Sequence, residues 1–178
     1  MVENNSIDRV PPPPLIKAEW EFPLGPLPTE EDFGNDLDGK CAWKNFGELT
    51  RPQAFRKFLE HTFYYSDAFT WMGTPAFVHY YPVIERYLAE YRRTTSEDDS
   101  EAWMLAHGIV AQYSQGGEKL SNLKDRMLRL ASYVRGNLDC FTLEERPRRR
   151  IDKAWLKVQQ SLAGSKTAGD DHTVIASD

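Results

Sequence analysis

Apolar side chains recur three and four residues apart in five stretches of the chain, which is the spacing of one face of an α-helix. The five faces consist of Phe55, Phe58, Leu59 and Thr62; of Phe77, Tyr81, Ile84, Leu88 and Tyr91; of Trp103, Ala106, Val110 and Ala111; of Leu120, Leu123, Met127, Leu130, Ala131 and Val134; and of Ile151, Ala154, Trp155, Val158 and Leu162. No stretch shows the sustained apolar–polar alternation of a half-buried strand. The pattern predicts an all-α fold, either an irregular five-helix bundle or an orthogonal array, with an extended proline-rich arm at its N-terminus.

Threonine and proline together mark two helix starts. Thr50 is a good N-cap, and Pro52 falls in the first turn, where its missing N–H is not needed. We expect this helix to end near residues 64–65. The Thr-Pro pair at residues 74–75 starts a second helix in the same way. Because Pro82 lies inside that second pattern, it should either kink the helix near His79 or split it into a short turn and a helix over residues 82–93.

Capping signals place the remaining helices. Ser96, followed by three acidic residues, begins a third helix that ends near Ser114. The Gly-Asn pair at residues 136–137 ends the fourth helix. Thr142 is a candidate cap for the fifth helix, which either runs through Pro147 or restarts there.

The two ends of the chain lack helical spacing. Residues 11–14 are four consecutive prolines, which favour polyproline II and exclude a helix. They are interpreted as part of a tether rather than as a ligand for a partner domain. The predicted organisation is a disordered proline-rich arm at residues 1–14, a single helical domain at residues 15–163 and a disordered tail at residues 164–178.

Residues 15–49 are predicted to be irregular. Trp20 and Phe22 alternate with polar residues, as in an extended segment that lays one face on a core. A small hairpin is left open here, and Thr29 with the acids after it starts a short helix. The acidic run at residues 35–39 lacks the glutamate that a calcium loop has at its last position, so no calcium site is expected.

Composition and charge narrow the possible partners. The 178 residues carry a net charge of -5 with a pI near 5.4. Net negative charge argues against nucleic-acid and anionic-membrane partners. The basic run at residues 146–150 is therefore interpreted as a solvated face or as a contact for the acidic N-terminal segment. The chain shows no secretory signal and no apolar run of about 18 residues, so we expect a cytoplasmic protein with Cys41 and Cys140 reduced.

Catalytic motifs are absent from the sequence. The best candidate acid/base pair is His79 with Asp67, because His79 lies near the expected kink. No nucleophile or oxyanion motif accompanies the pair, so a partly buried histidine among aromatic rings is the preferred interpretation of His79. His61 and His107 have no histidine three or four residues away, and no metal site or cofactor is predicted.

Aromatic residues gather between Leu49 and Arg93, which hold twelve of the chain's twenty-two Phe, Trp and Tyr residues. Core packing accounts for most of them. Tyr80 and Tyr81 point about 100° apart on a helix, so one of them is expected near the surface. Candidate binding residues are Trp71, Met72, Tyr80 and Tyr64, because Tyr, Trp and Met are frequent at protein interfaces.

Residues 37–88 contain a Leu-Thr helix start, the turn MGTPAF and the element YYP. This arrangement resembles small bacterial helical proteins of no known activity, which implies a bacterial origin and a helical fold. The preferred hypothesis is a non-enzymatic cytoplasmic protein that binds or regulates another protein, such as a toxin-immunity protein. The alternative is an enzyme that uses His79 and Asp67.

Overall fold

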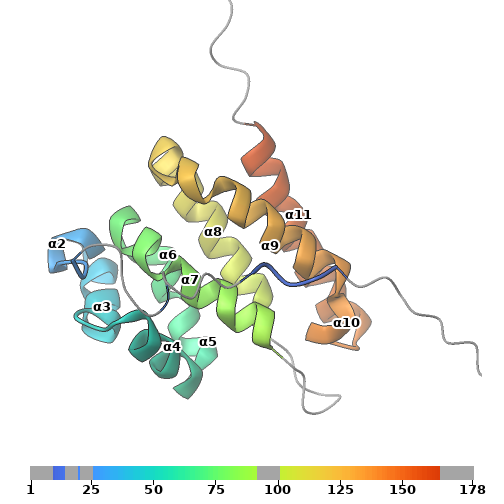
Figure 1. Cartoon of the computed structure of the whole chain (residues 1–178), viewed down its shortest axis with the longest axis horizontal. Helices are drawn as coiled ribbons and strands as arrows, with labels where there is room; N and C mark the ends of the chain where they lie inside the picture. The colour runs from blue at the N-terminus through green and yellow to red at the C-terminus, as the bar shows by residue number, and fades with distance from the viewer. Residues whose placement is uncertain (1–9, 15–19, 21–25, 92–100, 165–178) are drawn as a thin grey trace, which may run out of the picture.

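The computed structural model describes residues 10–14, 20, 26–91 and 101–164, which form helices joined by turns with no strand among them (Figure 1). The elements are α2 (Glu30–Phe33), α3 (Leu37–Phe46), α4 (Arg51–Glu60), α5 (Thr62–Ser66), α6 (Ala68–Trp71), α7 (Thr74–Glu90), α8 (Ala102–Gly116), the 3-10 helix η1 (Gly117–Leu123), α9 (Lys124–Gly136), α10 (Leu138–Phe141) and α11 (Glu145–Ala163). The all-α prediction is confirmed. The five-helix count is wrong, because breaks divide some expected helices and because α3 and α10 form where none was expected.

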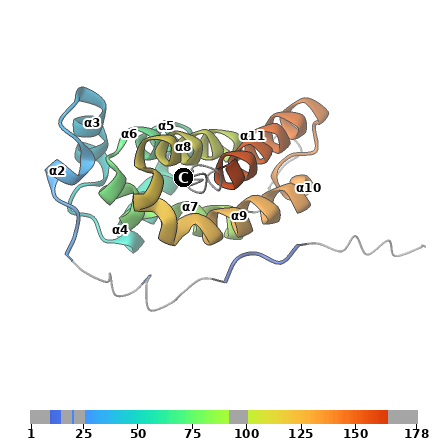
Figure 2. The same cartoon turned by 90° about the horizontal axis from the view of Figure 1, so that it is seen from above.

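The helices gather at two ends of the molecule with α7 between them (Figures 1 and 2). At one end, α11 packs along both α8 and α9. At the other end, α3 packs against α2 and α6. Helix α7 contacts α2 and α4 on one side and α8 on the other, so it is the central element of the fold.

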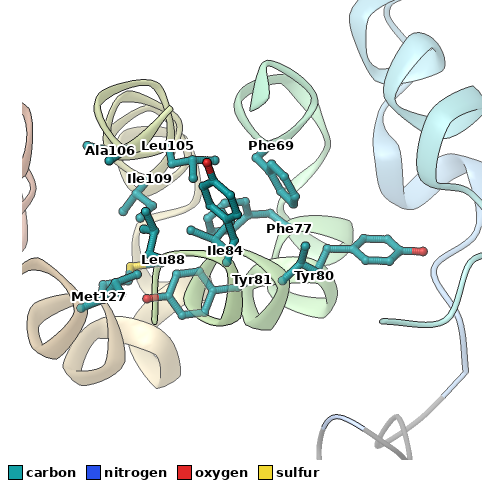
Figure 3. Close-up of a cluster of buried hydrophobic side chains, with 14 of the residues drawn as sticks. Phe69, Phe77, Tyr80, Tyr81, Ile84, Leu88, Leu105, Ala106, Ile109 and Met127 are labelled. Carbon is teal, nitrogen blue, oxygen red and sulfur yellow. The ribbon is translucent and has the colours of Figure 1, made fainter. Parts of the chain in front are cut away.

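Helix α7 supplies much of the core, since ten of its seventeen residues are buried. Tyr80 and Tyr81 point to opposite sides of the helix, and Tyr81 extends toward Met127 of α9 (Figure 3). Both tyrosines are fully buried. The prediction that one of them is left near the surface is wrong, because neighbouring helices enclose α7 on more than one face.

Pro82 lies within α7, and the helix continues through it to Glu90. Of the two alternatives expected at this proline, the split is therefore wrong. A proline deprives a carbonyl one turn earlier of its usual partner and crowds the preceding turn. The Arg51 Nε–H donates a hydrogen bond to the His79 carbonyl in that turn at 2.6 Å. This contact ties α4 to α7 beside the proline.

The first predicted helix is broken at His61, whose φ of -160° and ψ of 76° are not helical. Helix α4 therefore ends at Glu60, and the separate helix α5 begins at Thr62. The prediction of one continuous helix ending near residues 64–65 is wrong. The start at Thr50 is confirmed. The Gln53 side-chain oxygen accepts hydrogen bonds from the Thr50 backbone N–H and hydroxyl, both at 2.8 Å.

Helix α3 corrects the prediction that residues 15–49 are irregular throughout. The Asp36 carboxylate accepts a hydrogen bond from the Gly39 N–H at 2.7 Å and so caps the helix. A Cβ at position 39 would lie 2.4 Å from the Phe33 carbonyl oxygen, so the close approach of α2 requires glycine there. Phe46 at the end of α3 is fully buried. The predicted short helix after Thr29 is confirmed as α2.

The later helices follow several of the expected boundaries. Helix α9 ends at Gly136 with Asn137 directly after it, as predicted. Helix α11 begins at Glu145 and runs through Pro147 in its first turn. Its N-cap is Glu144 and not the expected Thr142, whose hydroxyl accepts a hydrogen bond from the Glu144 N–H at 3.3 Å. The expected start at Ser96 lies outside the described residues.

Of the predicted N-terminal arm, the structure describes residues 10–14, which lie alongside α9 (Figures 1 and 2). Residues 1–9 and the predicted tail beyond Gly164 lie outside the described residues. Within the described part of the chain, no helix is both long enough and apolar enough to cross a membrane.

Candidate protein-binding cleft

A cleft of about 430 Å³ opens between α3, α5 and α6. Phe63 and Tyr64 of α5 and Trp71 of α6 line it, and these side chains are 61%, 59% and 51% exposed. Single exposed apolar side chains are ordinary, but a contiguous group of them marks a candidate interaction surface. We call this surface, with Asp38 and Asp67 at its edge, the aromatic cleft.

The break at His61 determines which rings of α5 face the cleft. Tyr65 and Ser66 form the buried side of this short helix, and the Tyr65 ring packs edge-on against Phe46 at 5.6 Å between centroids. With Tyr65 turned inward, the preceding Phe63 and Tyr64 lie on the exposed side. One turn of helix can bury only one face, so these two rings remain in solvent.

Trp71 is held at the end of α6 by a buried amide from α8. The Gln112 Nε2–H group donates hydrogen bonds to the carbonyls of Phe69, Thr70 and Met72, at 3.2, 3.0 and 2.6 Å. Gln112 is only 1% exposed, so these bonds form away from water. They fix the backbone on both sides of Trp71 and leave its indole to project into the cleft.

The electrostatic character of the aromatic cleft is acidic. Its described lining includes Asp38 and Asp67 and contains no lysine or arginine. Carboxylates beside aromatic faces favour a cation, because the ring quadrupole and the negative charge attract it together. The arrangement can therefore bind a surface that presents apolar and basic side chains.

The structure brings together three of the residues singled out in the sequence. Tyr64, Trp71 and Asp67 all line the aromatic cleft. Met72 and Tyr80 are 1% and 0% exposed, so their expected place on a binding surface is wrong. The Tyr80 hydroxyl instead donates hydrogen bonds to the carbonyls of Phe46 and Leu49, at 2.7 and 2.8 Å. Burial raises the pKa of Tyr80, so the hydroxyl keeps its proton for these bonds.

His79 lies in a separate cavity of about 300 Å³ beside Arg51 and Asp32. Burial, with a smaller effect of the Arg51 charge, lowers the pKa of His79 to about 4. No carboxylate contributes to that shift, and Asp67 lines the aromatic cleft instead. The two residues of the candidate acid/base pair thus belong to different cavities. In the described part of the chain, the buried Nε2 atom of His79 has no hydrogen-bond partner.

Other features of the cleft were not foreseen in the sequence. Phe63 does not belong to the apolar face expected for the first helix. Its position off that face was the one sequence feature that could have indicated its exposure. Asp38 and Cys41 reach the cleft on α3, which was not expected to be a helix. Among the described residues, no group of three or more His, Cys, Asp or Glu side chains is arranged to hold a metal ion.

The basic run at residues 146–150 lies on α11 and engages its neighbours. Arg149 pairs with Glu145 one turn earlier, with Nε and Oε1 separated by 2.7 Å. The Arg150 guanidinium lies over the Trp103 ring, 3.1 Å from its centroid. Two of the four arginines in the run therefore have partners within the protein itself.

Comparison with known proteins finds no family model that matches the chain and no matching curated protein or solved structure. A fold class alone is compatible with many functions, so function has to be inferred from the site.

Proposed function

We propose that this protein acts without catalysis, by binding another protein through the aromatic cleft. The observation that carries the proposal is the exposure of Phe63, Tyr64 and Trp71, whereas most of the other aromatic rings that the structure describes are buried. Tyrosine and tryptophan supply large contact areas with little loss of side-chain freedom, which is why they dominate interface energetics.

The partner that fits the aromatic cleft is a protein with a basic surface. Asp38 and Asp67 lie beside the exposed rings, and the whole chain carries a net charge of -5. Complementary charge accelerates encounter and selects against acidic partners. A more specific form of the proposal is a bacterial toxin-immunity protein of the cytoplasm, which would neutralise its toxin by occupying such a surface.

An enzymatic function through His79 and Asp67 has less support. An acid/base pair requires its two side chains to lie within hydrogen-bond distance of each other. His79 and Asp67 instead line separate cavities. A histidine with a pKa of about 4 is also neutral at pH 7 and a weak base.

The test is retention of partners by the tagged protein in extracts of its native host. Trp71→Ala and Tyr64→Ala should each lose a partner that the parent retains at low and moderate salt. Leu143→Ala is the matched control, because Leu143 is 54% exposed but lies outside the cleft. The proposal fails if both cleft variants retain every partner of the parent, or if Leu143→Ala loses the same partner.

A further inference from the structure

Residues 10–14, which we call the proline strap, lie in a groove between α7 and α9. On one side, Pro12 and Pro13 border a cavity of about 320 Å³ with Glu85, Arg86 and Ala89 of α7. On the other side, Pro11 and Val10 border a cavity of about 380 Å³ with residues of α9, among them Leu128 and Ser132. The prolines therefore fill the groove incompletely, and three of them are exposed.

One buried side chain recognises the backbone of the strap. The Asn137 side-chain amide donates a hydrogen bond to the Val10 carbonyl at 2.8 Å and another to the Tyr133 carbonyl at 2.7 Å. Asn137 is 2% exposed, so its second N–H would lose its partner if nothing occupied the groove. The groove is thus built around a peptide carbonyl.

The end of α9 also makes room for the side chain of the same strap residue, Val10. A Cβ at Gly136 would lie 2.4 Å from Cγ2 of Val10. Gly136 does not have a positive φ, so its backbone does not itself require glycine. The absence of a side chain at position 136 therefore makes room for Val10, which packs partly buried against the core.

We infer that the groove between α7 and α9 is a binding site for an extended proline-rich peptide, which the protein's own strap fills. Consecutive prolines favour an extended conformation before binding, so little conformational entropy is lost when they dock. The observed contacts hold the strap mainly through Val10, and the prolines remain accessible. A proline-rich segment of a partner can then replace the strap on Asn137 and Gly136, at a surface separate from the aromatic cleft.

The groove can be opened without shortening the chain. Val10→Asp places a charge where an apolar side chain packs, so the strap should leave the groove. Trp20 remains as a second anchor, because it is 6% exposed and its ring meets Phe55 at 5.6 Å between centroids. Val10→Ala serves as a second release variant if the helical circular-dichroism signal of Val10→Asp is lost.

The probe is a fluorescently labelled synthetic peptide of residues 9–14, titrated into the full-length protein and followed by anisotropy. We expect at least tenfold tighter binding to the release variant than to the parent, whose groove is filled. Adding Gly136→Ala to the release variant should weaken binding at least tenfold. A peptide with glycine in place of all four prolines should bind at least tenfold more weakly.

The inference is overturned if the release variants bind the peptide no better than the parent. It is also overturned if Gly136→Ala leaves the affinity unchanged, or if the glycine peptide binds equally well. None of these outcomes depends on the aromatic cleft, so the two proposals can fail separately.

Discussion

The aromatic rings that pack around Tyr80 of α7 and the rings of the aromatic cleft come from the same part of the sequence. They differ in how far neighbouring helices cover them. Tyr80 lies 5.9 Å from Phe33 and 6.0 Å from Phe46, between ring centroids, and all three are fully buried. Phe63 and Trp71 are more than half exposed. Helix α7 is long and is enclosed by helices from distant parts of the sequence, whereas α5 and α6 are single turns that each bury one face and leave the other exposed. Enclosure by neighbouring helices, not aromatic content, therefore separates the core rings from the exposed rings of the aromatic cleft.

Replacing a phenylalanine by alanine in the core and in the aromatic cleft should give the largest difference in the free energy of unfolding. Phe46→Ala removes a fully buried ring and leaves a cavity among Tyr65, Phe69 and Tyr80, so we expect a loss of about 3–5 kcal/mol in the free energy of unfolding. Urea denaturation monitored by circular dichroism measures this loss.

Phe63→Ala is the matched control for Phe46→Ala. Its ring is 61% exposed, so the free energy of unfolding should change by no more than about 0.5 kcal/mol. If the two alanine variants lose similar stability, the contrast between core and cleft is wrong.

Short-range signals in the sequence predicted a good part of this fold. The spacing of Phe55 and Phe58 placed them on the buried side of α4, and both are buried. Thr50 and Asn137 lie at the helix boundaries they were expected to mark. Such signals act within one or two turns, so a single sequence is enough to read them.

The long-range contacts could not be read in the same way. The hydroxyl of Tyr80 is buried because the carbonyls of Phe46 and Leu49 accept its hydrogen bonds, and those residues lie more than thirty positions earlier. The break at His61 has no glycine or proline to announce it. Since that break sets the direction of Phe63 and Tyr64, the candidate site was predicted only through Tyr64, Trp71 and Asp67 and not as a cleft.

The pH dependence of stability tests whether His79 is held neutral beside the buried rings of α7. The unfolded chain takes up a proton at an ordinary histidine pKa of about 6.5, whereas the folded protein holds His79 neutral down to a pKa of about 4. The stability that this difference contributes is present above pH 6.5 and is lost as the pH falls toward 4. Because His79 is partly exposed, we expect a loss of roughly 1 kcal/mol between about pH 7 and pH 5.

The measurement compares urea denaturation of the parent and of His79→Gln at the two pH values. The variant should lose roughly 1 kcal/mol less than the parent over this interval. Burial also lowers the pKa of His107, which adds a change of the same sign to both proteins and cancels in the difference. An equal pH dependence in parent and variant would show that His79 is not held neutral.

Trp71 gives the smallest expected effect on stability and the most direct measure of the exposed side. Its indole is 51% exposed, whereas Trp155 is fully buried and its Nε1–H donates a hydrogen bond to the Ala102 carbonyl at 2.9 Å. Trp71→Phe should change the free energy of unfolding by no more than about 0.5 kcal/mol. It should nevertheless lower the tryptophan fluorescence that acrylamide quenches and shift the emission maximum to shorter wavelength, because the partly buried Trp43 and Trp103 are less accessible than Trp71. Trp155→Phe should leave the quenched component in place, because the Trp155 indole is fully buried and does not contribute to it. If Trp71→Phe and the parent show the same acrylamide quenching of tryptophan fluorescence, the aromatic cleft is closed in solution and the surface proposed for the partner does not exist.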